Sequence, residues 1–341
     1  MKTIHEIDNV AHSMNADSKL GLIRESRFQV FDLDALRYDE VCAPNECKQF
    51  YTFGDAFLVP DVKNHCTWVI DNGETMKLDS LLSMPANIER RSTKDYFYPL
   101  DRDLQGNRRI AKVDKRDFSI AEYYSVEIGS NGVSAILDDD SFLSINGTSI
   151  SAHEIKTNKE IWSNNFDDLM RNRKGTVNHN FEPVINNDSA YIYLTDSECS
   201  SNFSVVRINI RTGNTENEFE KVGGVLVKHN NSIYTVRHGI VQAINFESNA
   251  LRMHDYTEQL RLMGISMFWD RFTLKDNLLY FIHGHHLPSN SFGVANLDTN
   301  AIVENMDFPT SHGAEFVHTV KEINSRVVVR LSEGKLMIMD K

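Results

Sequence analysis

A short pattern recurs in the second half of the chain and constrains the fold more than any other feature. In each copy a polar Glu or Asn precedes an apolar residue, a charged residue follows, and Thr or Ser then precedes Asn or Gly. Repetition of one unit at fairly even spacing is typical of architectures built from copies of a single motif. The clearest copies span residues 152–158, 207–213, 243–249 and 294–300, with weaker ones near 30–35 and 112–117.

The pattern predicts a strand that runs into a tight turn. Asn and Gly readily adopt a positive φ angle, and the hydroxyl of Thr or Ser can bond to the turn backbone. The apolar residue anchors the end of the strand in a core. A second strand-like run follows each copy, at 160–162, 215–219, 251–253 and 302–306. Each copy is therefore expected to be a β-hairpin.

Further strand-like runs lie upstream of the hairpins. They are short, rich in β-branched and aromatic residues, and bounded by turn residues. Examples are 132–137 and 141–145 before the first clear copy, 224–227 and 232–236 before the third, and 271–274 and 278–282 before the fourth. Four strands per unit is the blade of a β-propeller.

The number of blades follows from the spacing of the turns. Hairpin turns are expected near residues 34, 72, 116, 158, 213, 249 and 300, about 44 residues apart, as in propeller repeats. Three more strand-like runs end the chain, and we expect a strand within residues 27–41 to complete this last sheet. The prediction is an all-β propeller of seven four-stranded blades, with six or eight left open, closed by pairing of N- and C-terminal strands. Residues 20–341 form its single domain, and residues 1–19 are an N-terminal arm or a short helix.

The turn pattern resembles the repeat of quinoprotein-type (pyrroloquinoline-quinone-like) propellers, and more loosely that of WD-repeat propellers. Quinoprotein repeats carry Leu-Asp-x-x-Thr-Gly-x-x-x-Trp, and here Trp162 follows Asn158 by four residues. Only this copy keeps the Trp, and among the clear copies only Gly213 keeps the Gly. The resemblance implies the fold. The family's quinone-dependent dehydrogenases are larger, exported and calcium-binding, so it does not imply their activity here.

Charge and cysteine content argue against some classes of function and indicate a cellular compartment. The chain has 36 basic and 48 acidic residues, a formal net charge of −12, which argues against binding nucleic acid mainly through phosphate neutralisation. The first nineteen residues lack the apolar run of a signal peptide, and no apolar stretch is long enough to span a membrane. We therefore predict a cytoplasmic protein with free thiols at its four cysteines. A Cys42–Cys47 disulfide and a structural zinc site are less favoured alternatives.

Three clusters were considered as binding sites. The histidines of 283–286 follow a strand and could bind Zn²⁺ or Cu²⁺, but an exposed polar loop is favoured because no carboxylate or cysteine is near. Residues 138–140 lack the turn glycine of a calcium loop, so a hairpin turn is favoured. Residues 167–168 are expected to cap a helix that continues through Lys174.

A basic stretch with aromatic residues spans 90–109, and residues 83–107 are also expected to form a long insertion between strands. Arginines 90, 91, 102, 108 and 109 surround Tyr96, Phe97 and Tyr98, a mixture that can mark RNA binding. We favour a long loop that carries these side chains over an RNA-binding site. The sequence contains neither a GxSxG elbow nor a phosphate-binding GxxxxGK[ST] motif. We assign no catalytic residue, metal or cofactor.

The leading hypothesis is a non-enzymatic, monomeric scaffold that binds a basic protein, because acidic charge favours such a partner. One specific form is a bacterial immunity protein that neutralises a basic toxin such as a nuclease. The alternative is a hydrolase or lyase with a site of His and carboxylates at the mouth of the propeller channel. A sugar-binding propeller is weaker, because the three Trp residues do not occupy equivalent positions. The partner-binding loops are predicted to carry Asp138, Asp139, Asp140, Asp167, Asp168, His283, His285 and His286.

Overall fold

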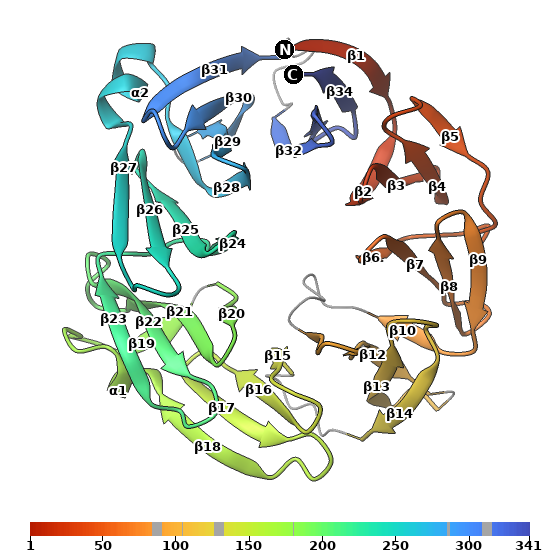
Figure 1. Cartoon of the computed structure of the whole chain (residues 1–341), viewed down its shortest axis with the longest axis horizontal. Helices are drawn as coiled ribbons and strands as arrows, with labels where there is room; N and C mark the ends of the chain where they lie inside the picture. The colour runs from red at the N-terminus through yellow and green to blue at the C-terminus, as the bar shows by residue number, and fades with distance from the viewer. Residues whose placement is uncertain (84–90, 104, 126–132, 180, 285–286, 309–315) are drawn as a thin grey trace. The chain divides into compact units, whose positions relative to one another are not determined.

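The computed structural model describes residues 1–83, 91–103, 105–125, 133–179, 181–284, 287–308 and 316–341. Strands dominate these residues and form eight sheets (Figure 1). Consecutive strands pair as antiparallel neighbours in most sheets, as expected for propeller blades. The predicted all-β propeller is confirmed.

The chain divides into two compact units. The N-terminal unit comprises Ile7–Ile145 and Ser151–Ser163, and the C-terminal unit comprises Met1–Glu6, Asn146–Ile150 and Asn164–Lys341. Sheets 1 to 3 and most of sheet 4 belong to the N-terminal unit. Sheets 5 to 8 belong to the C-terminal unit.

The first four sheets follow one another along the chain. Sheet 3 has five strands and the other three have four. Their bounds are, for sheet 1, β2 (Val10–Ala16), β3 (Lys19–Arg24), β4 (Arg27–Asp32) and β5 (Arg37–Asp39); for sheet 2, β6 (Tyr51–Phe53), β7 (Ala56–Asp61), β8 (Cys66–Asp71) and β9 (Glu74–Leu78); for sheet 3, β10 (Leu81–Ser83), β11 (Tyr96–Phe97), β12 (Leu100–Arg102), β13 (Arg108–Asp114) and β14 (Ile120–Tyr124); and for sheet 4, β15 (Ala135–Ile136), β16 (Ser141–Ile145), β17 (Ser149–Glu154) and β18 (Glu160–Asn165).

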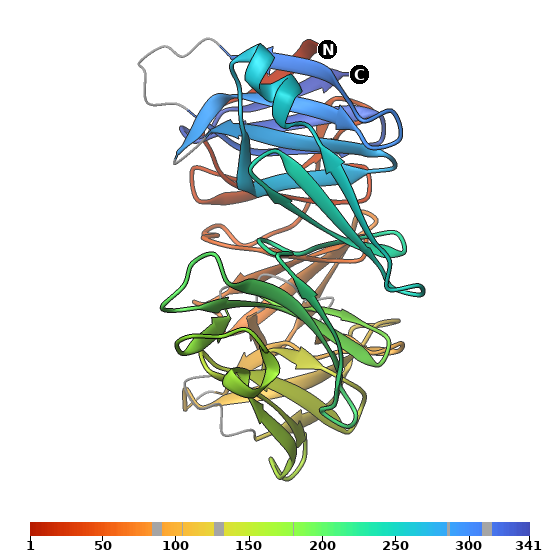
Figure 2. The same ribbon diagram turned by 90° about the vertical axis from the view of Figure 1, so that its left-hand side faces the viewer.

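The remaining sheets continue the order, with a fifth strand in sheet 5. Helices α1 (Phe166–Leu169) and α2 (Thr257–Met263) lie in the linkers before sheets 5 and 7, and Figure 2 shows α2 beside the last strand of sheet 7. The bounds are, for sheet 5, β19 (Val177–His179), β20 (Val184–Asn186), β21 (Ser189–Asp196), β22 (Phe203–Asn209) and β23 (Thr215–Glu220); for sheet 6, β24 (Val227–His229), β25 (Ser232–Arg237), β26 (Ile240–Asn245) and β27 (Leu251–Asp255); for sheet 7, β28 (Met267–Lys275), β29 (Leu278–Gly284), β30 (Pro288–Asn296) and β31 (Ala301–Asp307); and for sheet 8, β32 (Val317–Ile323), β33 (Arg326–Leu331), β34 (Leu336–Asp340) and β1 (Lys2–Ile7).

The ends of the chain share sheet 8. Strand β1 pairs with β34, so the predicted pairing of N- and C-terminal strands is confirmed, and Figure 1 shows the two termini next to one another. The prediction that a strand within residues 27–41 completes this sheet was wrong. The strands in this range are β4 and β5, which form a complete sheet with β2 and β3. Residues 1–19, expected to be an arm or a short helix, form β1, β2 and the start of β3 instead.

This reassignment also explains the blade count. The structure has eight sheets, not seven. Each of the seven expected hairpin turns belongs to a different sheet among sheets 1 to 7. Sheet 8 has no such turn, because its outer strand comes from the other end of the chain. Counting turns therefore misses one sheet.

The repeated pattern makes the same backbone hydrogen bond in each of its four clear copies, and in three of them the polar side chain also accepts two backbone N–H groups. In sheet 6 the Asn245 Oδ1 accepts the backbone N–H groups of Glu247 at 3.1 Å and Ser248 at 2.9 Å. The N–H of Phe246 donates to the carbonyl of Asn231 in the turn between β24 and β25. Asn249 then adopts a φ of 55°, which Asn tolerates better than most residues. The turn after the third strand is thus tied to the turn after the first, and both lie at one end of the sheet, which we call the turn end.

Aromatic residues fill the space between sheets within each unit. In the N-terminal unit, Phe50 and Phe57 are buried between sheets 1 and 2 with their ring centroids 6.0 Å apart. A Cβ atom on Gly21 would lie 2.5 Å from Phe50 and 2.7 Å from Phe57, so only glycine fits there. In the C-terminal unit, Phe281 and Phe292 pack on opposite faces of sheet 7, toward sheets 6 and 8 respectively.

We predict that Asn245→Ala destabilises the protein while Asn245→Asp does not. Alanine removes the acceptor of two backbone N–H groups, and each such bond contributes about 0.5–1.5 kcal/mol. The carboxylate of Asp accepts the same bonds. Urea unfolding should show a loss of about 1–2 kcal/mol for the Ala variant only. Equal unfolding midpoints for both variants would contradict this role of Asn245.

Candidate functional site

The three consecutive aspartates of sheet 4 have different roles. They form the turn between β15 and β16, as predicted. Asp138 Oδ1 accepts the N–H of Asp140 at 3.0 Å and the hydroxyl of Ser141 at 2.7 Å, so it builds the turn. The carbonyl of Asp140 accepts the N–H of Ile155 from the second turn of the same sheet. Asp138 and Asp140 therefore stabilise the turns of sheet 4.

Asp139 instead reaches to sheet 3. Its Oδ1 accepts the hydroxyls of Tyr98 and Thr93, both at 2.8 Å, and its Oδ2 accepts Lys112 Nζ at 2.9 Å. Burial opposes the charge of Asp139, but these three hydrogen bonds outweigh it and lower the pKa of the carboxyl. Burial, with the neighbouring carboxylate, raises the pKa of the Tyr98 hydroxyl. Asp139 is thus a link between two sheets more than a free contact residue.

The basic and aromatic residues of sheet 3 are mostly internal. Phe97 and Tyr98 are fully buried. Arg109 pairs with the buried Asp101 at 2.6 Å, and its guanidinium lies 3.5 Å from the ring centroid of Tyr123. Lys112 lies over the ring of Tyr96 at 4.1 Å. These two cations pack against aromatic rings, whereas Arg102 and Arg108 are exposed. Of the basic stretch, Arg90 lies outside the described residues.

An acidic pocket lies at the turn end of sheets 1 and 2 and was not identified from the sequence. It has a volume of about 100 Å³ and includes Asp17, Asp39 and Asp55 in its lining. Lys19 Nζ pairs with Asp39 at 2.7 Å. Asp17 and Asp55 are exposed, and no cation of the described residues pairs with either. Two uncompensated carboxylates therefore lie at the mouth of this pocket.

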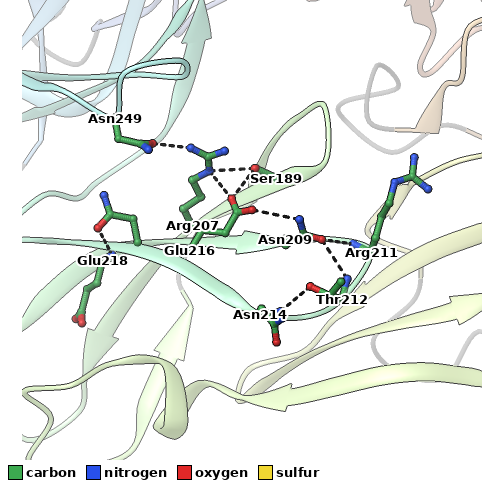
Figure 3. Close-up of polar contacts among 10 residues, drawn as sticks. Ser189, Arg207, Asn209, Arg211, Thr212, Asn214, Glu216, Glu218 and Asn249 are labelled. Atoms are coloured by element: carbon green, nitrogen blue, oxygen red, sulfur yellow. Dashed lines mark hydrogen bonds and ion pairs between the residues drawn. The ribbon is translucent and has the colours of Figure 1, made fainter.

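Charges at the turn end of sheet 5 are compensated. Figure 3 shows Arg207 bonded to three partners: Glu216 at 2.6 Å, the hydroxyl of Ser189 at 3.0 Å, and Asn249 Oδ1 at 2.6 Å. Asn249 belongs to the second turn of sheet 6, so Arg207 joins neighbouring sheets of the C-terminal unit. This network has no free charge and is suited to holding sheets together.

Asp167 and Asp168 lie in α1, which is shorter than predicted. The helix ends at Leu169 instead of continuing to Lys174, and its N-cap is Asn165, which accepts the N–H of Asp167. Asp167 Oδ1 accepts the N–H of Val177 at 2.8 Å. The following segment is held by Asp196, which accepts the N–H of Gly175. Although burial opposes its charge, bonds from Lys174, Glu198 and Gly175 lower the pKa of Asp196 to about 2. Asp168 is exposed.

His283 is buried, not part of an exposed loop. Strand β29 continues to Gly284, and the His283 ring stacks on Phe281 with a centroid distance of 5.4 Å. Burial lowers the pKa of His283 to about 4, although the charge of Asp307 opposes this, so the imidazole is neutral at pH 7. His285 and His286 lie outside the described residues. Among those described, no group of three His, Cys, Asp or Glu side chains is placed to hold a metal ion.

Four buried polar atoms of sheet 7 have no hydrogen-bond partner among the described residues. They are His283 Nε2, Asp270 Oδ1, Arg271 Nη1 and Ser289 Oγ. Register shifts occur between residues 267 and 272 of β28 and between residues 282 and 284 of β29, where it pairs with β30, so three adjacent strands are irregular at the same end of sheet 7. Burial raises the pKa of Asp270, an effect that the charge of Arg271 opposes. Perturbed groups of this kind occur at functional sites.

The cysteines and the helices bear on two further predictions. Cys42 is exposed, Cys47 and Cys66 are buried, and all four cysteines are free thiols. Neither helix in the described part of the chain is long or apolar enough to cross a bilayer.

Comparisons with known proteins support the fold and give no information on activity. No family model matches the chain, and no curated protein is significantly similar in sequence. Many solved structures resemble it, and two that do so along nearly its whole length are β-propellers. The computationally designed Ika8 protein has a TM-score of 0.58 and 11% identity, with 98% of this chain and 96% of that chain covered. BamB from Moraxella catarrhalis has a TM-score of 0.53 and 12% identity, with 100% and 99% covered.

We predict that Asp139→Asn destabilises the protein at neutral pH but not in acid. The folded-state pKa of Asp139 is lowered, so its stabilising effect is present above its unfolded pKa and is lost as the pH falls through the folded pKa. Because the side chain is 44% exposed, we expect a loss of only about 1 kcal/mol at pH 7. Denaturant unfolding at pH 7 and near pH 3 measures the difference. A penalty that stayed constant with pH would contradict the charged hydrogen bonds.

Proposed function

We propose that this propeller is a non-enzymatic scaffold that binds a basic protein. The observation that carries the proposal is the pair of uncompensated carboxylates, Asp17 and Asp55, at the acidic pocket of sheets 1 and 2. The net charge of −12 adds a long-range field that favours approach of a cationic surface. Complementary charge raises association rates and excludes acidic partners.

A more specific form of this proposal is an immunity protein. In this form the chain acts in the cytoplasm as a monomer and neutralises a basic toxin such as a nuclease. A surface that binds nucleic acid is itself basic, so an acidic scaffold can compete for it. The turn pattern around Asn158 and Gly213 supports placing the scaffold among quinoprotein-like propellers.

Matched charge variants test the binding surface. Asp17→Asn with Asp55→Asn removes two charges at the turn end of sheets 1 and 2. Glu25→Gln with Glu46→Gln removes two exposed charges from the opposite end of the same sheets. Asp17 has a φ of 47°, which Asn tolerates. Capture from the native lysate should recover a stoichiometric basic protein with the wild type and the Glu variant. With that purified partner at low salt, the Asp variant should associate about fivefold more slowly.

Two results would count against the proposal. One is the absence of any stoichiometric partner, or an acidic one. The other is an equal effect of the two double variants. The immunity form has a separate test: the captured partner, expressed alone, should stop growth, and co-expression of this chain should restore it. A harmless partner would reject the immunity form and leave the scaffold.

A second function, hydrolase or lyase, is favoured by one observation. His283, neutral at pH 7, lies beside an irregular strand that carries Asp270 with its raised pKa. A neutral imidazole is the form required of a general base. A panel of ester, phosphodiester and glycoside substrates would reveal activity that His283→Asn abolishes. Unchanged activity in that variant would exclude this site.

A further inference from the structure

A separate pocket lies in the C-terminal unit between sheets 5 and 6, away from the turn end. It has a volume of about 230 Å³ and is lined by Tyr193, Gly223, Gly224, Val236, Arg237 and His238. These residues come from the end of β21, the linker between β23 and β24, and the turn between β25 and β26. A pocket of this size is below the usual range for drug-sized ligands, about 300–1,000 Å³, so it suits a small molecule or a single side chain.

The two glycines shape the pocket. A Cβ atom on Gly223 would lie 1.9 Å from Cε2 of Tyr193, so glycine lets the ring lie directly against the backbone. Gly224 has a φ of 127°, a conformation that other residues rarely adopt. One wall is therefore backbone and another is an aromatic face. Val236 is fully buried behind these walls.

The charge at this pocket is opposite to that of the chain. Arg237 and His238 line it, and no Asp or Glu does. The Arg237 guanidinium lies 3.8 Å from the ring centroid of Phe203, and Nη1 donates to the Tyr193 hydroxyl at 3.4 Å. No carboxylate in the described part of the chain pairs with Arg237. An arginine held in place by aromatic rings but lacking a carboxylate is suited to receive one from a ligand.

We propose that this pocket binds a small carboxylate with an apolar body. The carboxylate pairs with Arg237 and accepts from the Tyr193 hydroxyl, and the apolar body packs on the Tyr193 ring. Burial raises the pKa of Tyr193, so its hydroxyl keeps the proton that it donates. Such a ligand is either a free small acid or the C-terminal residue of a peptide chain, because both present a carboxylate next to an apolar group.

Benzoate is the first probe, with benzamide as its uncharged analogue. Isothermal titration should show saturable binding of benzoate and none of benzamide. Arg237→Gln should weaken benzoate binding at least tenfold, which a charged hydrogen bond accounts for. Arg252→Gln is the matched control, because Arg252 is an exposed arginine of the same sheet that does not line this pocket. Gly223→Ala should also abolish binding without changing charge, by pushing the Tyr193 ring into the cavity.

Two peptides distinguish the sources of the carboxylate. They are Ala-Ala-Ala-Phe with a free C-terminus and the same peptide as its C-terminal amide. Tighter binding of the free peptide than of benzoate supports a peptide terminus, and binding of benzoate alone supports a free acid. The proposal is overturned if neither benzoate nor the free peptide binds more tightly than about 10 mM, or if Arg237→Gln and Arg252→Gln bind benzoate equally. Thermal unfolding of each variant confirms that a loss of binding is not a loss of folding.

Discussion

One backbone hydrogen bond recurs at the turn end of five of the eight sheets and ties two turns of each of these sheets together. The N–H of an apolar residue in the second turn donates to a carbonyl of the first turn. The donors are Leu33, Ile155, Ile210, Phe246 and Leu297, all buried. The polar residue just before each donor lies at the end of the third strand, and in four of these turns it accepts two backbone N–H groups. The N–H groups of these buried donor residues are thereby bonded within the protein, and four strands are tied together at one end.

This interaction explains which parts of the fold could be predicted. Its residue requirements are local, so Asn158, Gly213, Asn249 and Asn300 indicated turns that the structure contains, each with positive φ. Strand β1 carries no such signal, because only Ile7 of its six residues is buried, and its polar sequence is equally compatible with a short helix. Its partner β34 lies at the far end of the chain. A pairing over that sequence separation leaves no local pattern, so the eighth sheet was missed.

The candidate sites could also be predicted only where they depend on local sequence. Asp138, Asp139 and Asp140 are indistinguishable in sequence, and only the packing of sheet 4 on sheet 3 selects Asp139 as the residue that meets Tyr98. His283 was expected in an exposed loop, because it follows the strand predicted at 278–282 and the run of histidines precedes Pro288. In the structure, β29 extends one residue beyond it and buries the ring against Phe281. The acidic pocket required two sheets to be placed side by side, which residue spacing alone does not predict.

The acidity of the turn end has two origins, and only one of them bears on function. Turns of this geometry need side-chain acceptors, so carboxylates such as Asp32, Asp114 and Asp138 are used by the backbone of their own turns. Asp17 and Asp55 make no such bond among the described residues, and their charge is available to a partner. Turns at the opposite ends of the sheets use carboxylates in the same way, as Asp61 and Asp196 do. Two side chains at these opposite ends are not used by any turn. They are His283, which is buried and neutral, and Arg237, which pairs with no carboxylate of the described residues. Binding chemistry in a repeat of this kind is therefore best sought in residues that the repeat itself does not use.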